Sequence, residues 1–393
     1  MGDKSAFVGG MKLGKLCILF TDGDWIESKD QSDSGIRLIQ TGNIGNGEFL
    51  YKNDKAKYIS VDTFKRLNCK EVFPNDILVS RLPEPVGRGC IIPDIGEKMI
   101  TAVDCTICRI NENLVDRKYF CYFLESNAYK TQLEQHVTGT TRKRISRKNL
   151  SSVEIDIPEQ AKQKEVVYKL DRLKKIIQNY NRELDLLDEL VRARFVEMFG
   201  DNKYEELAVE KVCTSIVDCP HTTPKYNGDL RNPAIRTSEI KKGFITWDTM
   251  KYVSDEEYIE RTARLKPQQG DIVYGREGTF GNAAILPKGY KFCLGQRVML
   301  LRPNNEFCIS QYLLRALISD EVYNQALAKN NASTVAHVNV KDVKNFMIPV
   351  PPLELQNQFA SFVEEIDKSR SRIQKSLEAS QELFDSLMQE YFG

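Results

Sequence analysis

The sequence predicts an α+β protein with two mixed α/β domains, two long helices and a pseudo-two-fold internal repeat. The first observation behind this prediction is that two segments end alike, on Met198-Phe199-Gly200 and on Tyr391-Phe392-Gly393, 193 residues apart. The second is that a long helical stretch precedes each ending, with no gap in that offset. The third is that short β-rich pieces, broken by glycine, asparagine and proline, lie ahead of each stretch.

These patterns divide the chain into five segments. We expect a flexible leader over residues 1–10, a first domain over 11–158, a first helix over 159–200, a second domain over 201–351 and a second helix over 352–393. In the first domain, strands are predicted at residues 36–40, 76–80 and 102–110, and a helix at residues 116–135.

The two domains repeat each other in their scaffold but not in their loops. Asp76-Ile77-Leu78 recurs as Asp271-Ile272-Val273, and Tyr58-Ile59-Ser60 recurs as Tyr252-Val253-Ser254. The offset drifts between 193 and 196 residues in this region, so small insertions separate the copies. Diverged loops on one fold are typical of two domains that recognise different halves of a divided target. Sequence drift after duplication, with no difference in function, is the alternative.

The two long stretches carry apolar residues at alternating steps of four and three, the pattern of a coiled-coil seam. The predicted seam residues are Leu170, Leu173, Ile177, Tyr180, Leu184, Leu187 and Val191 in the first helix, and Val363, Ile366, Ile373, Leu377, Phe384 and Leu387 in the second. An apolar stripe needs a partner in water. A second helix returning along the first would give an antiparallel coiled coil roughly 60 Å long. A parallel coiled coil between two chains is the alternative.

Composition limits the classes of protein to which this chain can belong. A hydrophobic content of 41% is ordinary for a protein with real cores, and a net charge of +1 means that any DNA binding must come from local patches. No apolar run approaches a membrane span, and the N-terminus lacks the pattern of a signal peptide. The ten cysteines are scattered through apolar contexts, as free thiols are in a reducing compartment. We therefore expect a cytoplasmic protein with no membrane partner.

Cys105 and Cys108 have the spacing of metal ligands. The run around them is typical of a strand, which would point the two thiols to opposite faces, and no second pair accompanies them. We expect both cysteines to lie in the core, and we expect no metal site.

Two related but different domains held at a fixed distance suit duplex DNA with a split target site. The strongest basic patch is the loop at residues 138–148, whose five cations suit contacts to phosphates; a solvated basic loop is the alternative. The matching loop of the second domain, residues 330–337, is nearly uncharged. In the first domain the candidate DNA-binding residues are Gln40, Thr41, Asn43, Arg81, Arg88, Thr140, Arg142, Lys143, Arg144, Arg147 and Lys148. In the second they are Arg236, Thr237, Glu239, Arg276, Thr279, Asn282, Gln296, Arg297, Ser333, Thr334 and His337.

The junction between each domain and its helix carries a resemblance to a known family. A polar loop, an apolar strand, a proline and a glutamine-containing helix start occur in order at residues 144–163 and again at 338–356. Gly270-Asp271-Ile272-Val273 and Asn75-Asp76-Ile77-Leu78 add a second shared feature. On these residues the chain resembles, over positions 11–393, the specificity subunit of type I restriction-modification systems. The resemblance implies two target-recognition domains that read a bipartite DNA sequence. Because a rigid helical rod has a fixed length, we expect the helices to set the spacer between the two half-sites.

The resemblance also implies that chemistry lies in partner subunits. Two DNA adenine methyltransferase subunits would dock on the helices and use S-adenosylmethionine, and restriction or translocase subunits would add chemistry that needs ATP and Mg. The chain itself has no Asn-Pro-Pro-aromatic motif and no Gly-Lys-Ser/Thr phosphate loop, so we expect no catalytic residue and no cofactor in it. Two other functions remain open: a coiled-coil adaptor that presents two domains to protein partners, and an RNA-binding subunit, which would use stacking aromatic residues.

Overall fold

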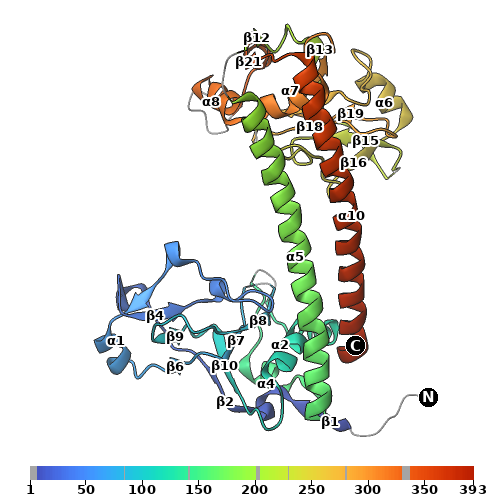
Figure 1. The fold of residues 1–393 in the computed structure, drawn as a ribbon. Helices are drawn as coiled ribbons and strands as arrows, with labels where there is room; N and C mark the ends of the chain where they lie inside the picture. Colours follow the sequence, from blue (N-terminus) through green and yellow to red (C-terminus); the bar gives the residue numbers. More distant parts are fainter. Residues whose placement is uncertain are drawn as a thin grey trace, which may run out of the picture. The chain divides into compact units, whose positions relative to one another are not determined.

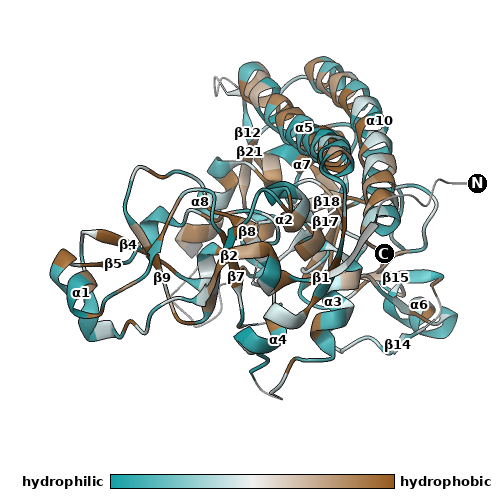
Figure 2. Ribbon diagram, turned by 90° about the horizontal axis from the view of Figure 1, so that it is seen from below, coloured by the Kyte–Doolittle hydropathy of each residue, from teal (hydrophilic) through white to brown (hydrophobic). Residues whose placement is uncertain are grey.

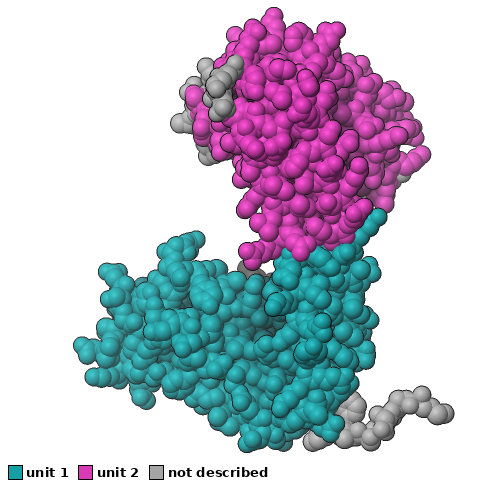
Figure 3. Space-filling model, viewed as in Figure 1, with its two compact units in different colours: residues 1–181, 375–393 teal, residues 182–374 magenta. Residues whose placement is uncertain are grey.

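The computed structural model describes residues 7–83, 85–139, 142–200, 204–228, 230–278, 281–329 and 337–393. The chain forms two compact units: unit 1 comprises residues 1–181 and 375–393, and unit 2 comprises residues 182–374 (Figure 3). Each unit contains one globular α/β part and a portion of both long helices (Figure 1). Within the described residues, no helix is both long and apolar enough to cross a membrane.

Short strands and helices form the globular part of unit 1. They are β1 (Phe7–Lys12), β2 (Cys17–Asp22), β3 (Gln31–Ser32), β4 (Ile36–Ile39), β5 (Tyr58–Ile59), α1 (Val61–Arg66), β6 (Glu71–Val72), β7 (Ile77–Ser80), β8 (Gly89–Ile91), β9 (Met99–Thr101), β10 (Cys105–Ile110), α2 (Arg117–Glu125), α3 (Asn127–Glu134), α4 (Arg147–Ser152) and β11 (Glu154–Pro158). The first long helix, α5 (Gln160–Phe199), follows directly and continues into unit 2.

The globular part of unit 2 follows a similar order. Its elements are β12 (Glu206–Ala208), β13 (Cys213–Asp218), β14 (Tyr226–Asn227), β15 (Asn232–Ile235), β16 (Lys251–Val253), α6 (Asp255–Arg261), β17 (Ile272–Gly275), β18 (Ala283–Ile285), β19 (Cys293–Leu294), β20 (Val298–Pro303), α7 (Ser310–Leu317), α8 (Asp320–Lys329), α9 (Val340–Lys344) and β21 (Met347–Pro349). The second long helix is α10 (Leu353–Phe392).

The sheets of the two units share one strand order. Unit 1 has an antiparallel sheet β2-β10-β7-β8, and unit 2 has the matching sheet β13-β20-β17-β18. A second sheet, β3-β5-β4-β9-β6 in unit 1, corresponds to β14-β16-β15-β19 in unit 2, and each contains one parallel pair. In each globular part, the first strand pairs with the last strand, β1 with β11 in unit 1 and β12 with β21 in unit 2. The described elements thus confirm that the mixed α/β domain occurs twice.

The expected elements are confirmed where the sequence pattern is long, and they shift where a turn intervenes. The first long helix, expected over residues 159–200, is present as Gln160–Phe199. The helix expected at 116–135 breaks at Ser126, whose hydroxyl accepts a hydrogen bond from the N–H of Tyr129 and starts a new helix. The strand expected at 102–110 begins only at Cys105, because residues 102–104 form a turn.

Residues 7–10 form part of a strand within the segment expected to be a flexible leader. The sequence predicts a loose segment over residues 1–10, but β1 begins at Phe7 and pairs with β11, with Gly10 opposite Asp156. The prediction is therefore wrong for residues 7–10. The backbone of this glycine-containing segment forms a strand because β11 offers it an edge, which no side-chain pattern reveals.

The cores lie on both faces of the central sheets, where apolar residues (brown in Figure 2) line the strands. Cys105 and Cys108 confirm the expectation of opposite faces: Cys105 packs with Ile39 and Leu78, whereas Cys108 packs with Leu13 and other residues of a second cluster. Burial raises the pKa of the Cys105 thiol to about 12. Among the described residues, no group of three His, Cys, Asp or Glu side chains is placed to hold a metal ion.

A buried glutamine joins each long helix to the domain before it. Gln163 accepts a hydrogen bond from the N–H of Asp116 at 2.7 Å and donates to the carbonyls of Leu114 and Pro158. Gln356 makes the same three kinds of bond in unit 2, with the N–H of Ile309 at 3.0 Å and the carbonyls of Phe307 and Pro351. Neither glutamine has exposed surface. The glutamine in the predicted junction thus fixes the start of each long helix to the preceding domain.

A buried aspartate supports the central sheet in each unit. Asp76 lies just before β7 and receives two hydrogen bonds of 2.8 Å from Arg109 of β10. Asp271 lies just before β17 and receives two bonds of 2.8 Å from Arg302 of β20. Each carboxylate also accepts a backbone N–H three residues earlier in the chain. The repeated aspartate that the sequence places before these strands therefore ties neighbouring strands together.

We expect the substitution Asp271→Asn to lower the free energy of unfolding of unit 2 by about 2 kcal/mol, because a neutral amide cannot accept both charge-assisted bonds from Arg302. Urea unfolding would be followed by the fluorescence of Trp247 in a Trp25→Phe background, since the chain has only two tryptophans. Trp247 packs on Tyr290 and Phe292, so its emission reports the folding of unit 2. The exposed Asp248→Asn variant is the matched control, and an equal shift in both variants would contradict the structural role.

Candidate nucleic-acid interface

An arginine–aspartate pair occurs at the same place in both units. In unit 1, Arg81 follows β7, and its Nε lies 3.2 Å from Oδ1 of Asp22, the last residue of β2. In unit 2, Arg276 follows β17, and its Nη2 lies 2.8 Å from Oδ1 of Asp218, the last residue of β13. Both guanidinium groups also donate to backbone carbonyls, and only 14% and 9% of the two arginine side chains is exposed. The two predicted arginines therefore hold strand ends together.

Two other predicted residues close the turns that follow β4 and β15. Asn43 is buried, and its Oδ1 accepts a hydrogen bond from the backbone N–H of Gln40 at 3.0 Å. Glu239 is fully buried and accepts bonds from the backbone and guanidinium of Arg236 and from two hydroxyl groups. Burial raises the pKa of the Glu239 carboxyl, but these hydrogen bonds outweigh it and lower the pKa overall. The side-chain atoms of both residues are committed within the protein.

A third pair of predicted residues bridges loops within each unit. Arg88 donates to the carbonyl of Ile44 at 2.7 Å, and Asn282 donates to the carbonyl of Ile240 at 3.1 Å. Ile44 and Ile240 occupy matching positions after β4 and β15, so two different side chains make the same link. Three further predicted residues are half-buried near these turns: Gln40, Thr41 and Thr237.

Four exposed cations of unit 1 line a groove of about 600 Å³, which we call the basic groove. Its charged lining consists of Lys12, Lys15, Arg147 and Lys148, together with Asp22. The remaining lining residues are Gly14, Phe20 and Ser151. The predicted residues Arg142, Lys143 and Arg144 are exposed on the loop that leads to this groove. Four cations against one carboxylate make the groove attractive to a polyanion.

Local packing brings the two halves of the basic groove together. The N–H of Leu13 donates to the carbonyl of Val153 at 2.9 Å, which sets the turn between β1 and β2 against the end of α4. The hydroxyl of Ser146 accepts from the N–H of Asn149 and fixes the start of α4. Lys12 precedes this turn and Lys15 lies within it. The sequence does not mark either lysine as a neighbour of α4, because both lie far from it in the chain.

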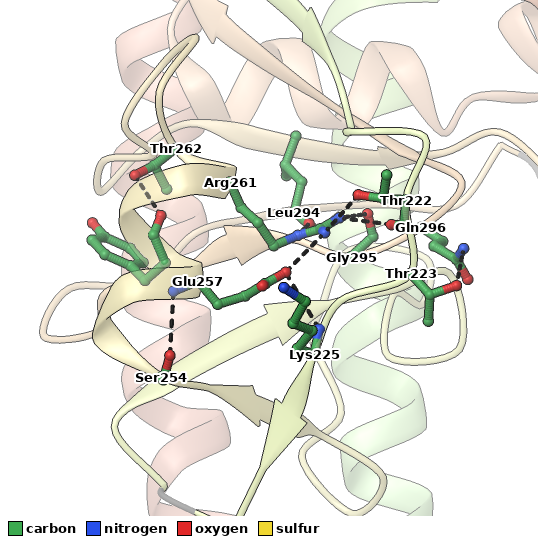
Figure 4. A network of polar contacts seen from close by, with 11 residues as sticks. Thr222, Thr223, Lys225, Ser254, Glu257, Arg261, Thr262, Leu294, Gly295 and Gln296 are labelled. Atoms are coloured by element: carbon green, nitrogen blue, oxygen red, sulfur yellow. Dashed lines mark hydrogen bonds and ion pairs between the residues drawn. The ribbon is translucent and has the colours of Figure 1, made fainter.

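The predicted residues of unit 2 that keep accessible polar groups lie on different loops and carry a different chemistry. Gln296 is half-buried, and its Nε2 donates to the hydroxyl of Thr223 at 2.9 Å (Figure 4). Arg297 is exposed, and its Nε lies 3.0 Å from Oε2 of Glu277. His337 is exposed and forms a backbone bridge with Glu277. The structure therefore places three predicted residues of unit 2 close to the end of β17.

Four predicted residues lie outside the described residues: Thr140, Thr279, Ser333 and Thr334. Each lies within a few residues of a described candidate, since Arg142 follows the first, Arg276 precedes the second and His337 follows the last two. They remain predictions, as do the contacts of the exposed candidates with DNA.

Comparison with known proteins identifies relatives along most of the chain. The Methylase_S family, described as the type I restriction modification DNA specificity domain, matches residues 10–188 and 228–381. The putative type I restriction enzyme MjaX specificity subunit of Methanocaldococcus jannaschii is 20% identical over 377 residues, covering 88% of this chain and 82% of that protein. The type I restriction enzyme EcoKI specificity subunit of Escherichia coli K12 is 20% identical over 371 residues, covering 88% and 78%.

Solved structures share the fold. A chain from a study of the assembly and conformational transition of the type I R-M system superimposes with a TM-score of 0.59 at 14% identity, covering 100% of this chain and 99% of the other. The type I restriction-modification S subunit from M. genitalium gives 0.57 at 13% identity, with 100% and 98% covered. Each of the two specificity-domain matches takes in most of a globular part and most of a long helix, so the chain belongs to the type I restriction modification DNA specificity domain family.

Proposed function

We propose that this chain is the DNA sequence-recognition subunit of a type I restriction-modification complex and reads a bipartite target, one half-site per globular domain. The observation that carries the proposal is the combination of one repeated strand order with two chemically different exposed surfaces. The basic groove of unit 1 suits phosphate contacts, whereas the half-buried amide of Gln296 in unit 2 suits a base edge.

The long helices would set the spacer between the half-sites as an antiparallel coiled coil. Contacts within unit 2 support an antiparallel pair: Asp188 lies 2.5 Å from Arg370, while Phe195 and Phe199, further along α5, meet Phe359 near the start of α10. In unit 1, Lys169 near the start of α5 donates to the hydroxyl of Tyr391 near the end of α10. Every predicted seam residue is buried or half-buried.

The same helices would dock two DNA adenine methyltransferase subunits. Large apolar side chains are left on their outer faces: Leu186 and Leu190 of unit 2 are 49% and 47% exposed, and Leu383 of unit 1 is 50% exposed. Exposed apolar residues near one another mark interaction surfaces. S-adenosylmethionine would belong to these partners, and ATP and Mg to restriction or translocase subunits, in a cytoplasmic complex. A coiled-coil adaptor without DNA specificity is the competing function.

Genome-wide mapping of N6-methyladenine tests the proposed function. The chain would be expressed with the methyltransferase encoded beside it, and methylated sites would be mapped by single-molecule sequencing. We expect one split motif with a fixed spacer that disappears when the gene for this chain is deleted. A methylation pattern that does not change on deletion of the gene would favour a coiled-coil adaptor without DNA specificity.

The basic groove gives a second test. We expect the combined change Lys12→Gln, Lys15→Gln, Arg147→Gln and Lys148→Gln to weaken DNA binding by the complex about 100-fold at physiological salt, equally for cognate and unrelated duplexes. The slope of log affinity against log salt should become shallower by roughly 3 to 4, because each lost phosphate contact contributes about 0.9. Fluorescence anisotropy at several salt concentrations measures both quantities.

The matched control replaces Lys55 and Lys65, two exposed lysines of unit 1 that do not line the groove, by glutamine. An unchanged salt slope in the groove variant, or an equal change in the control, would remove the basic groove from the DNA interface.

A further inference from the structure

The loop between β19 and β20 has a tightly constrained backbone. A Cβ atom at Gly295 would lie 2.5 Å from the carbonyl oxygen of Ile235, so a larger residue does not fit there. Arg297 adopts a φ of 66°, a conformation that costs free energy in a non-glycine residue. Gln296 lies between these two positions, so its side chain projects from a constrained stretch of backbone.

A buried arginine fixes this loop to a neighbouring segment. Arg261 of α6 donates to the carbonyl of Leu294 at 2.8 Å and to that of Gly295 at 3.2 Å. The same guanidinium donates to the carbonyl of Thr222 at 3.3 Å, and Glu257 balances its charge at 3.3 Å. Figure 4 shows the arginine between the helix and both loops. Gln296 and Thr223 are therefore held in a defined relation.

The amide of Gln296 is oriented by this arrangement. One N–H of its Nε2 donates to the hydroxyl of Thr223 at 2.9 Å, which leaves the second N–H and Oε1 for another partner. An N–H donor beside a carbonyl acceptor matches N7 and N6 of adenine in the major groove. We propose that Gln296 recognises an adenine in the half-site read by unit 2, with Thr223 as its positioning residue. This inference rests on the proposed function.

The equivalent loop of unit 1 does not carry this chemistry. β9 and β10 are joined by three residues, Ala102-Val103-Asp104, just as β19 and β20 are joined by Gly295-Gln296-Arg297. One backbone contact is the same in both units: the backbone N–H of Arg81 donates to the carbonyl of Asp104, and the backbone N–H of Arg276 donates to the carbonyl of Arg297. Valine stands where unit 2 has Gln296, so adenine recognition by this loop belongs to one half-site only.

Motif mapping of variants tests the inference. With the wild-type chain and its methyltransferase, one half-site of the methylation motif should require adenine at one position. With the Gln296→Ala variant, any base should be accepted at that position. The other half-site, the spacer and the remaining positions should be unchanged, and affinity for the original target should fall about tenfold or more. Thr223→Val, which removes only an exposed hydroxyl, should relax the same position by a smaller factor. A structural defect would not single out one base.

Gln269→Ala is the matched control, because Gln269 is an exposed glutamine at the opposite end of the same sheet. An unchanged motif in Gln296→Ala, relaxation at positions in both half-sites, or a half-site without adenine would each overturn the assignment. Failure of the proposed function is distinguishable, since the wild-type chain would then direct no split motif at all.

Discussion

Replacing Gln356 by leucine is expected to lower the free energy of unfolding of unit 2 by about 4 kcal/mol. The substitution removes three hydrogen bonds at once and leaves the N–H of Ile309 and the carbonyls of Phe307 and Pro351 without partners in a buried site. Each buried polar group left unsatisfied costs about 1–3 kcal/mol, and the better packing of leucine offsets only part of that loss. Urea unfolding monitored by Trp247 in the Trp25→Phe background measures the change.

The nearby Gln358→Leu variant is the control, because Gln358 is an exposed glutamine on the same turn of α10. We expect it to change the free energy of unfolding by less than about 0.5 kcal/mol. Hydrogen exchange gives a local readout: the amide of Ile309 should lose protection in Gln356→Leu only. Equal effects of the two variants, or a protected Ile309 in both, would show that the buried glutamine does not hold the helix to the domain.

The elements that the sequence predicts well are those with a long period or a repeat. The helix over Gln160–Phe199 follows from its uninterrupted seven-residue pattern, and the repeated domain follows from matched apolar strands. The break at Ser126 and the strand at residues 7–10 depend on one cap and one free strand edge. Such single contacts leave no periodic signal, so the sequence pattern missed both.

The candidate site was harder to predict, because residue type does not reveal a side chain's partner. Arg81, Arg88 and Arg276 have the chemistry of guanine readers, yet their guanidinium groups bind carbonyls and aspartates of the same chain. No local pattern in the sequence marks Lys12 and Lys15, because only the folded chain brings them beside α4. The cations on the loop before α4 were found because they are consecutive and carry their signal locally.

The buried ion pair of α6 should be the other position where a single change has a large effect. Only 2% of the Arg261 side chain and 9% of the Glu257 side chain is exposed. The change Arg261→Met would leave the Glu257 carboxylate buried without its counter-charge and free three carbonyls, so we expect a loss of about 3–5 kcal/mol in unit 2. The exposed Arg264→Met variant, three residues further along, should change the free energy of unfolding by less than about 0.5 kcal/mol.

A double-mutant cycle separates the charge effect from the lost packing of the loop. When Glu257→Met is added to Arg261→Met, no uncompensated charge remains, and we expect about half of the lost stability to return. The carbonyls of Leu294 and Gly295 stay without the arginine in the double variant, so full recovery is not expected. The same urea titration, read by Trp247, gives all four corners of the cycle. A double variant less stable than Arg261→Met would mean that Glu257 stabilises unit 2 through other contacts, such as the N–H of Lys225, and not as the counter-charge of Arg261.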